Sequence, residues 1–314
     1  MFKYNRQEIK LLAMENNFIA NNVEKVLRLC DVLDFINENK ISQYLALKGG
    51  TAINLFLLGL ERLSIDIDFD FLINLTKDNL VLIRNDIKNT ITGFMLNEGY
   101  FLSDKSKFTH SLDSFVFSYN TTSNSKDILK IEINYSNRVH ILNVKNDSIL
   151  IELNRRVCIN RLDDYELIGS KINALILRTT PRDVYDVYKL LNRFNLEMPY
   201  IRKVVIFYLS LGSDIPLNMD LLFLRFYEKI RLINYNKLRE TLIPVLHRSE
   251  KIDIVEMVDE VIKFVKLIFE LGNDEKNYIN NFNDGNYRPD ILFLGYKIND
   301  LSNHPMALWK IKNI

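Results

Sequence analysis

The stretch SIDIDFDF, at residues 64–71, decides the predicted fold. Its apolar and acidic residues alternate, so a β-strand would place the apolar side chains on one face and Asp66, Asp68 and Asp70 on the other. Aspartate is depleted in strands, and like charges on one strand face repel each other. Three aspartates at alternate positions therefore need an explanation.

Two explanations fit this acidic strand. The first is an edge strand whose polar face is solvated. The second is a cation site, because alternate residues of a strand lie roughly 6.5–7 Å apart at Cα and their carboxylates can converge on one Mg²⁺ or bridge two. Mg²⁺ prefers carboxylate and phosphate oxygens, so such a site suits nucleotide chemistry.

A second alternating stretch, at residues 129–135, carries one further acid, Glu132, between Lys130 and Asn134. If this stretch pairs as a strand beside Asp66 and Asp68, three carboxylates meet on one face. Two of them could hold metal ions, and the third could take a proton from an attacking hydroxyl or complete a second metal site. Taken by itself, Glu132 could equally be a surface residue.

A glycine turn precedes the acidic strand. Gly49, Gly50 and Thr51 follow a short apolar run and precede a segment of helical pattern, Ala52 to Leu58, which Gly59 would end. Backbone N–H groups at a helix start bind anions, and glycine lets the backbone approach a phosphate closely. The turn is neither a P-loop nor a dinucleotide fingerprint. The alternative is an ordinary strand-to-helix turn with Thr51 as the N-cap.

Hydrophobic periodicity predicts an α+β chain, with strands and helices mixed in its first half and mostly helices in its second half. We expect a helix over 6–38, strands near 44–48, 65–73, 114–119 and 129–135, a hairpin loop over 120–127, and a further strand near 149–153 or 156–159. A helix of about 17 residues should begin at Asp78. After Asp163 only helices are expected, near 165–178, 181–193, 204–211, 221–232, 235–245 and 252–269. The predicted domains are residues 1–162 and 163–314.

Composition narrows the class of protein. Hydrophobic residues make up 47% of the chain and charged residues 26%, the balance of a soluble globular protein. The net charge of +1 gives no global attraction to nucleic acid or acidic membranes. Two cysteines, Cys30 and Cys158, and four scattered histidines supply no metal-ligand motif. No signal-peptide core and no apolar run of about 20 residues occurs, so we expect a cytoplasmic protein without a membrane partner.

The order of these features resembles the polymerase-β-like nucleotidyltransferase superfamily. The sequence LKGGTA at 47–52, followed by RLSIDIDF at 62–69, resembles the motifs of the AbiEii/AbiGii toxin family, to which the MenT toxins are related. Three later segments extend the resemblance to Lys310: KINA at 171–174, PRDVYD at 181–186 and HPMALWK at 304–310. The α+β fold it implies is a polymerase-β-like nucleotidyltransferase domain with a mixed sheet, followed by a mostly helical domain.

The resemblance also assigns site residues. It implies that Asp66 and Asp68 bind Mg²⁺ or Mn²⁺ and that Glu132 is the third acid of the site. Lys171 would contact the nucleotide phosphates, and Asp183 or Asp186 would complete the site.

Residues around the glycine turn receive roles as well. Pyrophosphate would lie over Gly49, Gly50 and Thr51, with Arg62 helping to neutralise it. Ser64 matches a serine that related toxins use and that a kinase-like antitoxin can phosphorylate.

Several of these residues have plainer interpretations. Lys171 could extend to solvent from an apolar helix face. Asp183 stands three residues after Thr180, a capping-box arrangement, so Asp186 is the better functional candidate. Arg182 could bind a triphosphate or pair with Asp186 four residues later. Tyr185 and Tyr188 could stack on a base, but core packing fits their spacing better.

The expected reaction is attack by an acceptor hydroxyl on the α-phosphate of a nucleoside triphosphate, with release of pyrophosphate. Residues 201–251 are locally basic, and such a stretch could hold an RNA backbone or be a set of solvated helix faces.

The resemblance points to the 3′ end of tRNA as the acceptor, so that transfer blocks translation in a toxin–antitoxin or phage-defence (abortive infection) system with a cognate antitoxin. The alternatives are nucleotidylation of a protein or small molecule, and a GTP-binding toxin that acts without RNA transfer.

Overall fold

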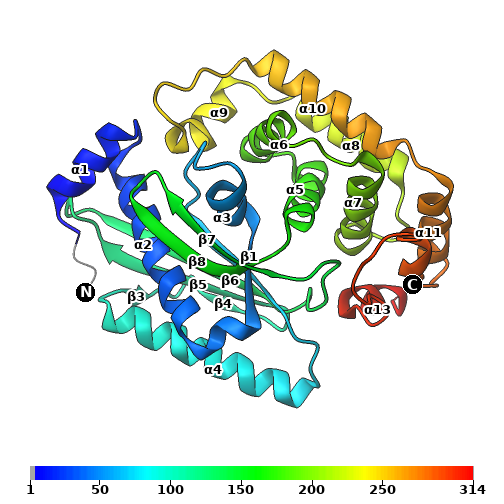
Figure 1. Cartoon of the computed structure of the whole chain (residues 1–314), viewed down its shortest axis with the longest axis horizontal. Coiled ribbons are helices and arrows are strands. Elements are labelled where there is room, and N and C mark those ends of the chain that lie inside the picture. The colour runs from blue at the N-terminus through cyan, green and yellow to red at the C-terminus, as the bar shows by residue number, and fades with distance from the viewer. Residues whose placement is uncertain (1–3, 314) are drawn as a thin grey trace. The chain divides into compact units, whose positions relative to one another are not determined.

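The chain forms two compact units, each built from three segments. Figure 1 labels their helices and strands. The computed structural model describes residues 4–313. Unit 1 consists of Met1–Arg138, Val144–Leu162 and Val245–Ser249, and unit 2 of Val139–Asn143, Asp163–Pro244 and Glu250–Ile314.

One mixed sheet forms the centre of unit 1. Strand β2 (Asp66–Phe71) pairs in parallel with β6 (Lys126–Asn134) and antiparallel with β1 (Leu45–Lys48), so the prediction that the two acidic strands are neighbours is confirmed. The sheet runs in the order β3 (Phe101–Leu102), β5 (Leu112–Asn120), β6 (Lys126–Asn134), β2 (Asp66–Phe71), β1 (Leu45–Lys48), β8 (Arg155–Arg161) and β7 (Lys145–Ile151), and β4 (Lys107–Phe108) also pairs with β5.

The apolar face of β2 is buried as the alternation predicts. Ile67, Phe69 and Phe71 have no exposed surface, and Ile67 and Phe69 are in register with Ile131 and Ile133 of β6. Full burial of one such side chain contributes about 1.5–3 kcal/mol, so this face fixes the register of the strand. The acidic residues must then point to the opposite face.

The expected single helix over 6–38 is wrong, because the chain forms α1 (Arg6–Glu15) and α2 (Ala20–Glu38). Asn17 adopts a left-handed conformation with φ of 55°, and the Phe18 N–H closes the turn on the Ala13 carbonyl. Asparagine tolerates this region of φ better than most residues. Helical periodicity on both sides of such a residue does not reveal the break.

The remaining elements of unit 1 differ from the prediction mainly in extent. Helix α4 covers Lys77–Asn97 and buries Ile87, Ile91 and Met95. The two alternative positions for a last strand are both occupied, by β7 and β8, which form a hairpin whose turn contains Asn154 with φ of 53°. The short strands β3 and β4 were not predicted.

Unit 2 is helical, as expected. Helix α5 packs against α6, α7 and α8, and Gly169 permits the close approach of α7, because a Cβ there would lie 2.4 Å from Val204 Cγ1. None of the helices among residues 4–313 is long and apolar enough to cross a bilayer. The helices are α5 (Asp164–Arg178), α6 (Pro181–Arg193), α7 (Met198–Gly212), α8 (Met219–Ile230), α9 (Tyr235–Thr241), α10 (Ile254–Phe269), α11 (Asn273–Asn283), α12 (Pro289–Leu292) and α13 (Pro305–Ile311).

The short segment Val139–Asn143 belongs to unit 2 because a buried acid holds it there. Glu166 on α5 accepts hydrogen bonds from the backbone N–H groups of Ile141 (2.9 Å) and Leu142 (3.1 Å) and from the hydroxyl of Tyr208 (2.7 Å). Glu166 is fully buried, and burial raises the pKa of its carboxyl.

Candidate active site

The acidic face of β2 lies between two strands that carry lysines. Asp68 is in register with Glu132 on β6 and with Lys48 on β1, and Asp66 is in register with Lys130. Partners directly opposite each other on neighbouring strands project to the same face of a sheet. The pairing therefore sets the three predicted acids on one face, interleaved with two cations.

Ion pairs organise this face. Lys48 Nζ lies 2.6 Å from Asp70 Oδ1, and Lys130 Nζ lies 2.8 Å from Glu132 Oε2. Asp70 is 1% exposed, so it is a buried structural partner of Lys48 rather than a solvated residue. Neither lysine was among the predicted site residues, although Lys130 alternates with Glu132 in the sequence.

Asp68 is a largely desolvated acid of this face. Burial raises the pKa of its carboxyl; the charge of Lys48 opposes this rise, and repulsion from Asp66 and Glu132 adds to it. A carboxylate that is desolvated and surrounded by like charges gains most from a bound cation.

The donor set of this face fits a hard divalent cation in its chemistry, because Asp66, Asp68 and Glu132 offer only oxygen ligands. Within residues 4–313, however, no three acidic, histidine or cysteine side chains converge as a ready-made metal cluster. Glu132 is instead held by Lys130.

The glycine turn lies directly against this acidic face. Gly49 has φ of 69°, in the left-handed region, and a Cβ there would lie 2.5 Å from Asp68 Oδ2. At Gly50 a Cβ would lie 3.0 Å from a guanidinium nitrogen of Arg62 and 3.2 Å from Ser64 Oγ. The structure thus brings both glycines together with Asp68, Arg62 and Ser64; a side chain at position 49 would be strained, whereas one at position 50 would require Arg62 or Ser64 to shift by a few tenths of an ångström.

Thr51 is not the N-cap of the following helix. Helix α3 covers Gly49–Ala52, and its N-cap is Lys48, which makes no capping hydrogen bond with its side chain. Thr51 is 1% exposed; its hydroxyl donates to the Asp66 carbonyl oxygen and lies 2.9 Å from Ser64 Oγ. The hydroxyl therefore ties the turn to the start of β2.

The helix continues from α3 into a π-helical turn over Ile53–Leu57. Asn54 donates from its side chain to the Gly50 carbonyl oxygen at 2.9 Å, and Gly59, with φ of 65°, ends the segment as predicted. π-Helical turns occur preferentially at functional sites, because they change the direction of side chains within a helix.

A second charged cluster lies within unit 2. Lys171 on α5 is 5% exposed, and its ammonium lies 2.8 Å from Asp186 Oδ2 and 3.2 Å from Asp183 Oδ1. Asp183 also accepts hydrogen bonds from Arg178 at 2.7 and 2.8 Å and from the Thr180 hydroxyl at 2.6 Å. Lys171 therefore does not extend to solvent.

Cations and a hydroxyl group surround the carboxylate of Asp183. Burial acts to raise the pKa of Asp183, but Arg178, Lys171 and Thr180 outweigh it and hold the pKa well below its usual range. The Asp183 N–H also donates to Thr180 at 3.3 Å, so the predicted cap of α6 is present. Thr180 is thus the N-cap of α6 with Asp183 in the first turn, and Asp186 is a fully buried partner of Lys171.

Comparison with known proteins identifies the family of the chain. A family model described as "Nucleotidyl transferase AbiEii toxin, Type IV TA system" matches residues 32–264. The chain belongs to this family. The match includes both acidic strands, the glycine turn and the Lys171 cluster, so the chain is a toxin-type nucleotidyltransferase.

One solved structure, that of MenT4, supports the fold of the chain. MenT4, a nucleotidyltransferase toxin from Mycobacterium tuberculosis H37Rv, has a TM-score of 0.60 and 14% identity, over 88% of this chain and 94% of that chain. A candidate nucleotidyltransferase from H. pylori has a TM-score of 0.46 and 21% identity, over 80% of this chain and 95% of that chain. No curated protein matches the chain.

Two other residues of this AbiEii-family chain, Arg182 and Tyr185, make structural contacts in unit 2. Arg182 donates from Nε to the Thr241 carbonyl oxygen at 2.7 Å. Tyr185 is 1% exposed, so it packs in the core as its spacing suggested.

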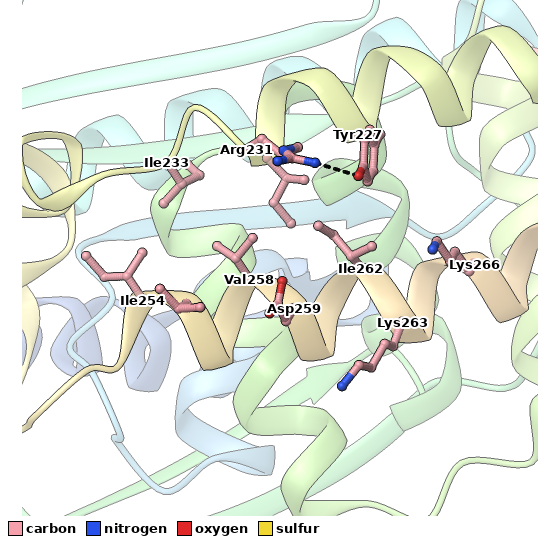
Figure 2. Close-up of a pocket in the computed structure, with 11 residues that line it drawn as sticks. Tyr227, Arg231, Ile233, Ile254, Val258, Asp259, Ile262, Lys263 and Lys266 are labelled. Atoms are coloured by element: carbon pink, nitrogen blue, oxygen red, sulfur yellow. Dashed lines mark hydrogen bonds between the residues drawn. The ribbon is translucent and has the colours of Figure 1, made fainter.

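The basic stretch at 201–251 does not form one continuous patch. Lys203 is buried and ion-paired with Asp274 and Glu275, and Arg202 donates to the Leu267 carbonyl oxygen. Arg231 lies at the edge of a groove between α8 and α10, where it donates to the Tyr227 hydroxyl (Figure 2). The exposed cations of the stretch are Arg225, Lys229, Arg231, Lys237, Arg239, Arg248 and Lys251.

Proposed function

We propose that this AbiEii-family enzyme transfers a nucleoside monophosphate from a nucleoside triphosphate to the 3′ end of tRNA and thereby blocks translation. One observation carries the proposal: the strand register sets Asp68 beside Glu132, with the backbone of Gly49 against the Asp68 carboxylate. This arrangement offers acids and anion-binding backbone at one place, as phosphoryl transfer requires.

Asp66, Asp68 and Glu132 would hold Mg²⁺ or Mn²⁺, which when bound stabilises the negative charge that develops on the phosphates. The chain's own groups do the remaining work. The N–H groups of Gly49, Gly50 and Thr51 would receive the pyrophosphate, and the Arg62 guanidinium, which lies against Gly50, would neutralise it.

The bond changes follow from this placement. The acceptor oxygen forms a bond to the α-phosphorus while the bond to pyrophosphate breaks, and the hydroxyl proton passes to the Glu132 carboxylate. In unit 2, the buried pair of Lys171 and Asp186 is the further nucleotide-binding group that the family resemblance implies.

The acceptor is proposed on two grounds. Family resemblance favours tRNA, and unit 2 presents exposed cations at Arg225, Lys237, Arg239 and Lys251 that could contact a phosphate backbone. Such a toxin acts in the cytoplasm, where tRNA and nucleotides are found, and needs a cognate antitoxin. Ser64, adjacent to Gly50 and Thr51, is the proposed point of control, because a phosphate there would occupy the anion-binding turn.

The direct test is incubation of the purified protein with each α-labelled nucleoside triphosphate, Mg²⁺ and total tRNA. We expect label in tRNA, pyrophosphate release, and a loss of about 10²–10³-fold in Asp66→Asn and Asp68→Asn. Asp104→Asn is the matched control, because that acid is exposed in a loop outside the site. Label that stays out of RNA and enters protein or a small molecule would contradict the tRNA acceptor.

A growth experiment addresses the toxin function. Expression of the natural chain should arrest growth, and Asp66→Ala should restore it at equal protein level. Continued arrest by this variant would favour a toxin that binds nucleotide without transferring it.

A further inference from the structure

A groove of about 470 Å³ lies between α8 and α10 of unit 2 (Figure 2). On α10 its lining residues recur four apart, at Ile254, Val258, Ile262 and Lys266. With a rise of about 1.5 Å per residue, this face of α10 is roughly 18 Å long. The groove is thus an elongated feature rather than a compact hole.

The floor of the groove is aliphatic. Its apolar lining comes from both helices and from the turn after α8. Among the lining residues, Val255 is 70% exposed, so it is accessible to a partner. The apolar lining residues are Ile230, Ile233, Ile254, Val255, Val258 and Ile262.

The charges around this floor are mostly positive. Arg231, Lys263 and Lys266 line the groove against a single acid, Asp259. All four are exposed. Among residues 4–313, no acid lies within ion-pair distance of Lys263 or Lys266, so both ammonium groups are available to a partner.

The lining does not suit a nucleobase. Tyr227 is the aromatic residue of the groove, and its ring is already engaged: Arg231 lies 5.3 Å from the ring centroid and Phe223 stacks on it at 6.1 Å. Single-stranded nucleic acid is held by stacking on accessible aromatic faces, which an aliphatic floor does not provide. An aliphatic floor flanked by cations instead matches an amphipathic peptide whose polar side is acidic.

We propose that the groove between α8 and α10 binds an acidic amphipathic helical segment of a partner protein. Aliphatic side chains of that segment, spaced three and four residues apart, pack on Val255, Val258 and Ile262. Its carboxylates pair with Arg231, Lys263 and Lys266. This binding is separate from nucleotide transfer and does not depend on it.

The test uses a fluorescein-labelled helical peptide of about 18 residues, with leucines at one face and glutamates at the other, and fluorescence anisotropy with the full chain. We expect saturable binding that weakens as ionic strength rises, because exposed ion pairs are screened. The double variant Lys263→Glu/Lys266→Glu should weaken binding by about tenfold or more. Val255→Glu, which places a like charge on the exposed floor, should weaken it comparably.

The matched control is Lys276→Glu/Lys297→Glu, which reverses two exposed lysines outside the groove. It should bind the peptide with unchanged affinity, and both double variants should retain nucleotide transfer. The proposal is overturned if the peptide does not bind, or if it binds the groove and control variants equally. It is also overturned if a labelled single-stranded RNA, and not the peptide, shows the dependence on Lys263 and Lys266.

Discussion

Gly49 is the residue at which backbone geometry and the acidic site meet. A side chain at this position would both strain a backbone with φ of 69° and displace the carboxylate of Asp68. We therefore predict that Gly49→Ala lowers the free energy of unfolding by about 1 kcal/mol and the transfer rate by about tenfold or more. Chemical denaturation and pyrophosphate release measure the two effects.

A matched control for this substitution exists in α4. Gly93 lies inside the helix, and a Cβ there would meet nothing within 4 Å. Gly93→Ala should leave activity unchanged and stabilise the chain by about 0.5–1 kcal/mol. Equal losses in both variants would show that the turn has no special relation to Asp68.

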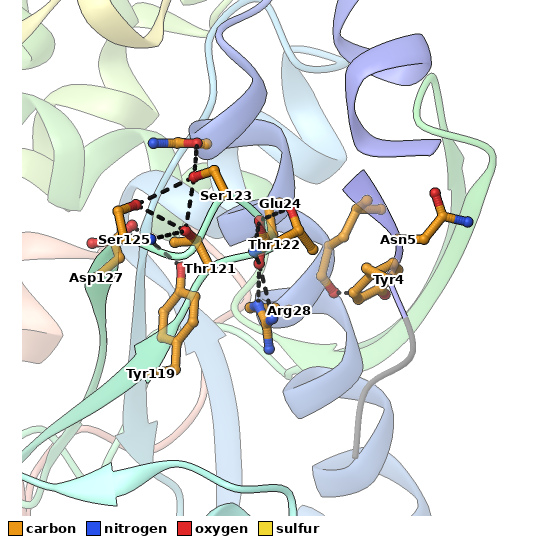
Figure 3. A network of polar contacts seen from close by, with 12 residues as sticks. Tyr4, Asn5, Glu24, Arg28, Tyr119, Thr121, Thr122, Ser123, Ser125 and Asp127 are labelled. Carbon is orange, nitrogen blue, oxygen red and sulfur yellow. Dashed lines mark hydrogen bonds and ion pairs between the residues drawn. The ribbon is translucent and has the colours of Figure 1, made fainter. Parts of the chain in front are cut away.

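Glu24 is a fully buried acid that ties α2 to the hairpin between β5 and β6 (Figure 3). Its carboxylate accepts hydrogen bonds from the Arg28 guanidinium at 2.8 and 3.0 Å, and from the backbone N–H and the hydroxyl of Thr122. We predict that Glu24→Gln destabilises the fold by about 3 kcal/mol, because Arg28 is left buried without its counter-charge. Urea unfolding measures the loss, and Glu15→Gln, an exposed acid on α1, should stay within about 0.5 kcal/mol of the natural chain.

At the residue scale, sequence alternation predicts the positions of Asp66, Asp68 and Glu132, because a strand with one buried face must send these side chains to the other. It does not predict the ion pairs of Lys48 and Lys130. Which cation meets which acid depends on strand partners and their register, and no local pattern encodes the antiparallel pairing of β1 with β2.

Helix α2 is joined to β8 by an acid whose ionisation opposes folding at neutral pH. Arg155 on β8 lies 2.6 Å from Asp31 and 2.5 Å from Asp34, and the Tyr4 hydroxyl donates to Asp31. Burial raises the pKa of Asp31 to about 6, with Asp34 adding to the rise and Tyr4 and Arg155 opposing it.

The raised pKa of Asp31 determines the direction in which the free energy of unfolding changes with pH. Between about pH 4 and pH 6 the folded chain binds a proton at Asp31 that the unfolded chain does not, so this group makes stability increase as pH falls from 7 towards 4. We predict that Asp31→Asn removes this dependence, worth at most about 2 kcal/mol after solvent screening. Urea unfolding at pH 5, 6 and 7 would give parallel curves for both chains if the prediction is wrong.

At the element scale, long and strongly periodic segments were predicted well, and α6 begins and ends at the expected residues. The failures have local causes. A single left-handed asparagine divides α1 from α2, and the strands β3 and β4 are two residues long, too short to show alternation. The segments of β7 and β8 were predicted as alternative positions of a single strand, because only a short turn separates them and both are mostly polar.

At the scale of the whole molecule, a short segment from late in the chain belongs to unit 1. Val245–Ser249 belongs to unit 1: the Leu63 N–H donates to the Val245 carbonyl oxygen at 2.8 Å, and the Arg248 N–H donates to that of Asn17. The rings of Phe18 and His247 lie 4.0 Å apart. Strand periodicity gives way to helical periodicity around residue 162, but neither pattern indicates that so short a later segment joins the first half.

A fragment experiment tests the importance of this segment. We predict that residues 4–162 fused through a Gly/Ser linker to residues 243–250 melt several degrees higher than the same fragment with a scrambled tail, because two backbone hydrogen bonds and one ring contact are restored. Calorimetry or circular dichroism measures the difference. Equal melting temperatures would mean that the segment contributes nothing to unit 1.

The late return of Val245–Ser249 has a consequence for how the chain is made. During translation, a domain encoded at the start of a gene usually folds as soon as it leaves the ribosome. Here the Leu63 N–H, next to Ser64 in the chain, donates to the Val245 carbonyl oxygen, some 180 positions downstream. The surroundings of the glycine turn are therefore completed only when most of the polypeptide has emerged. A nascent chain interrupted before that point would carry the acidic strands without the segment that completes their unit.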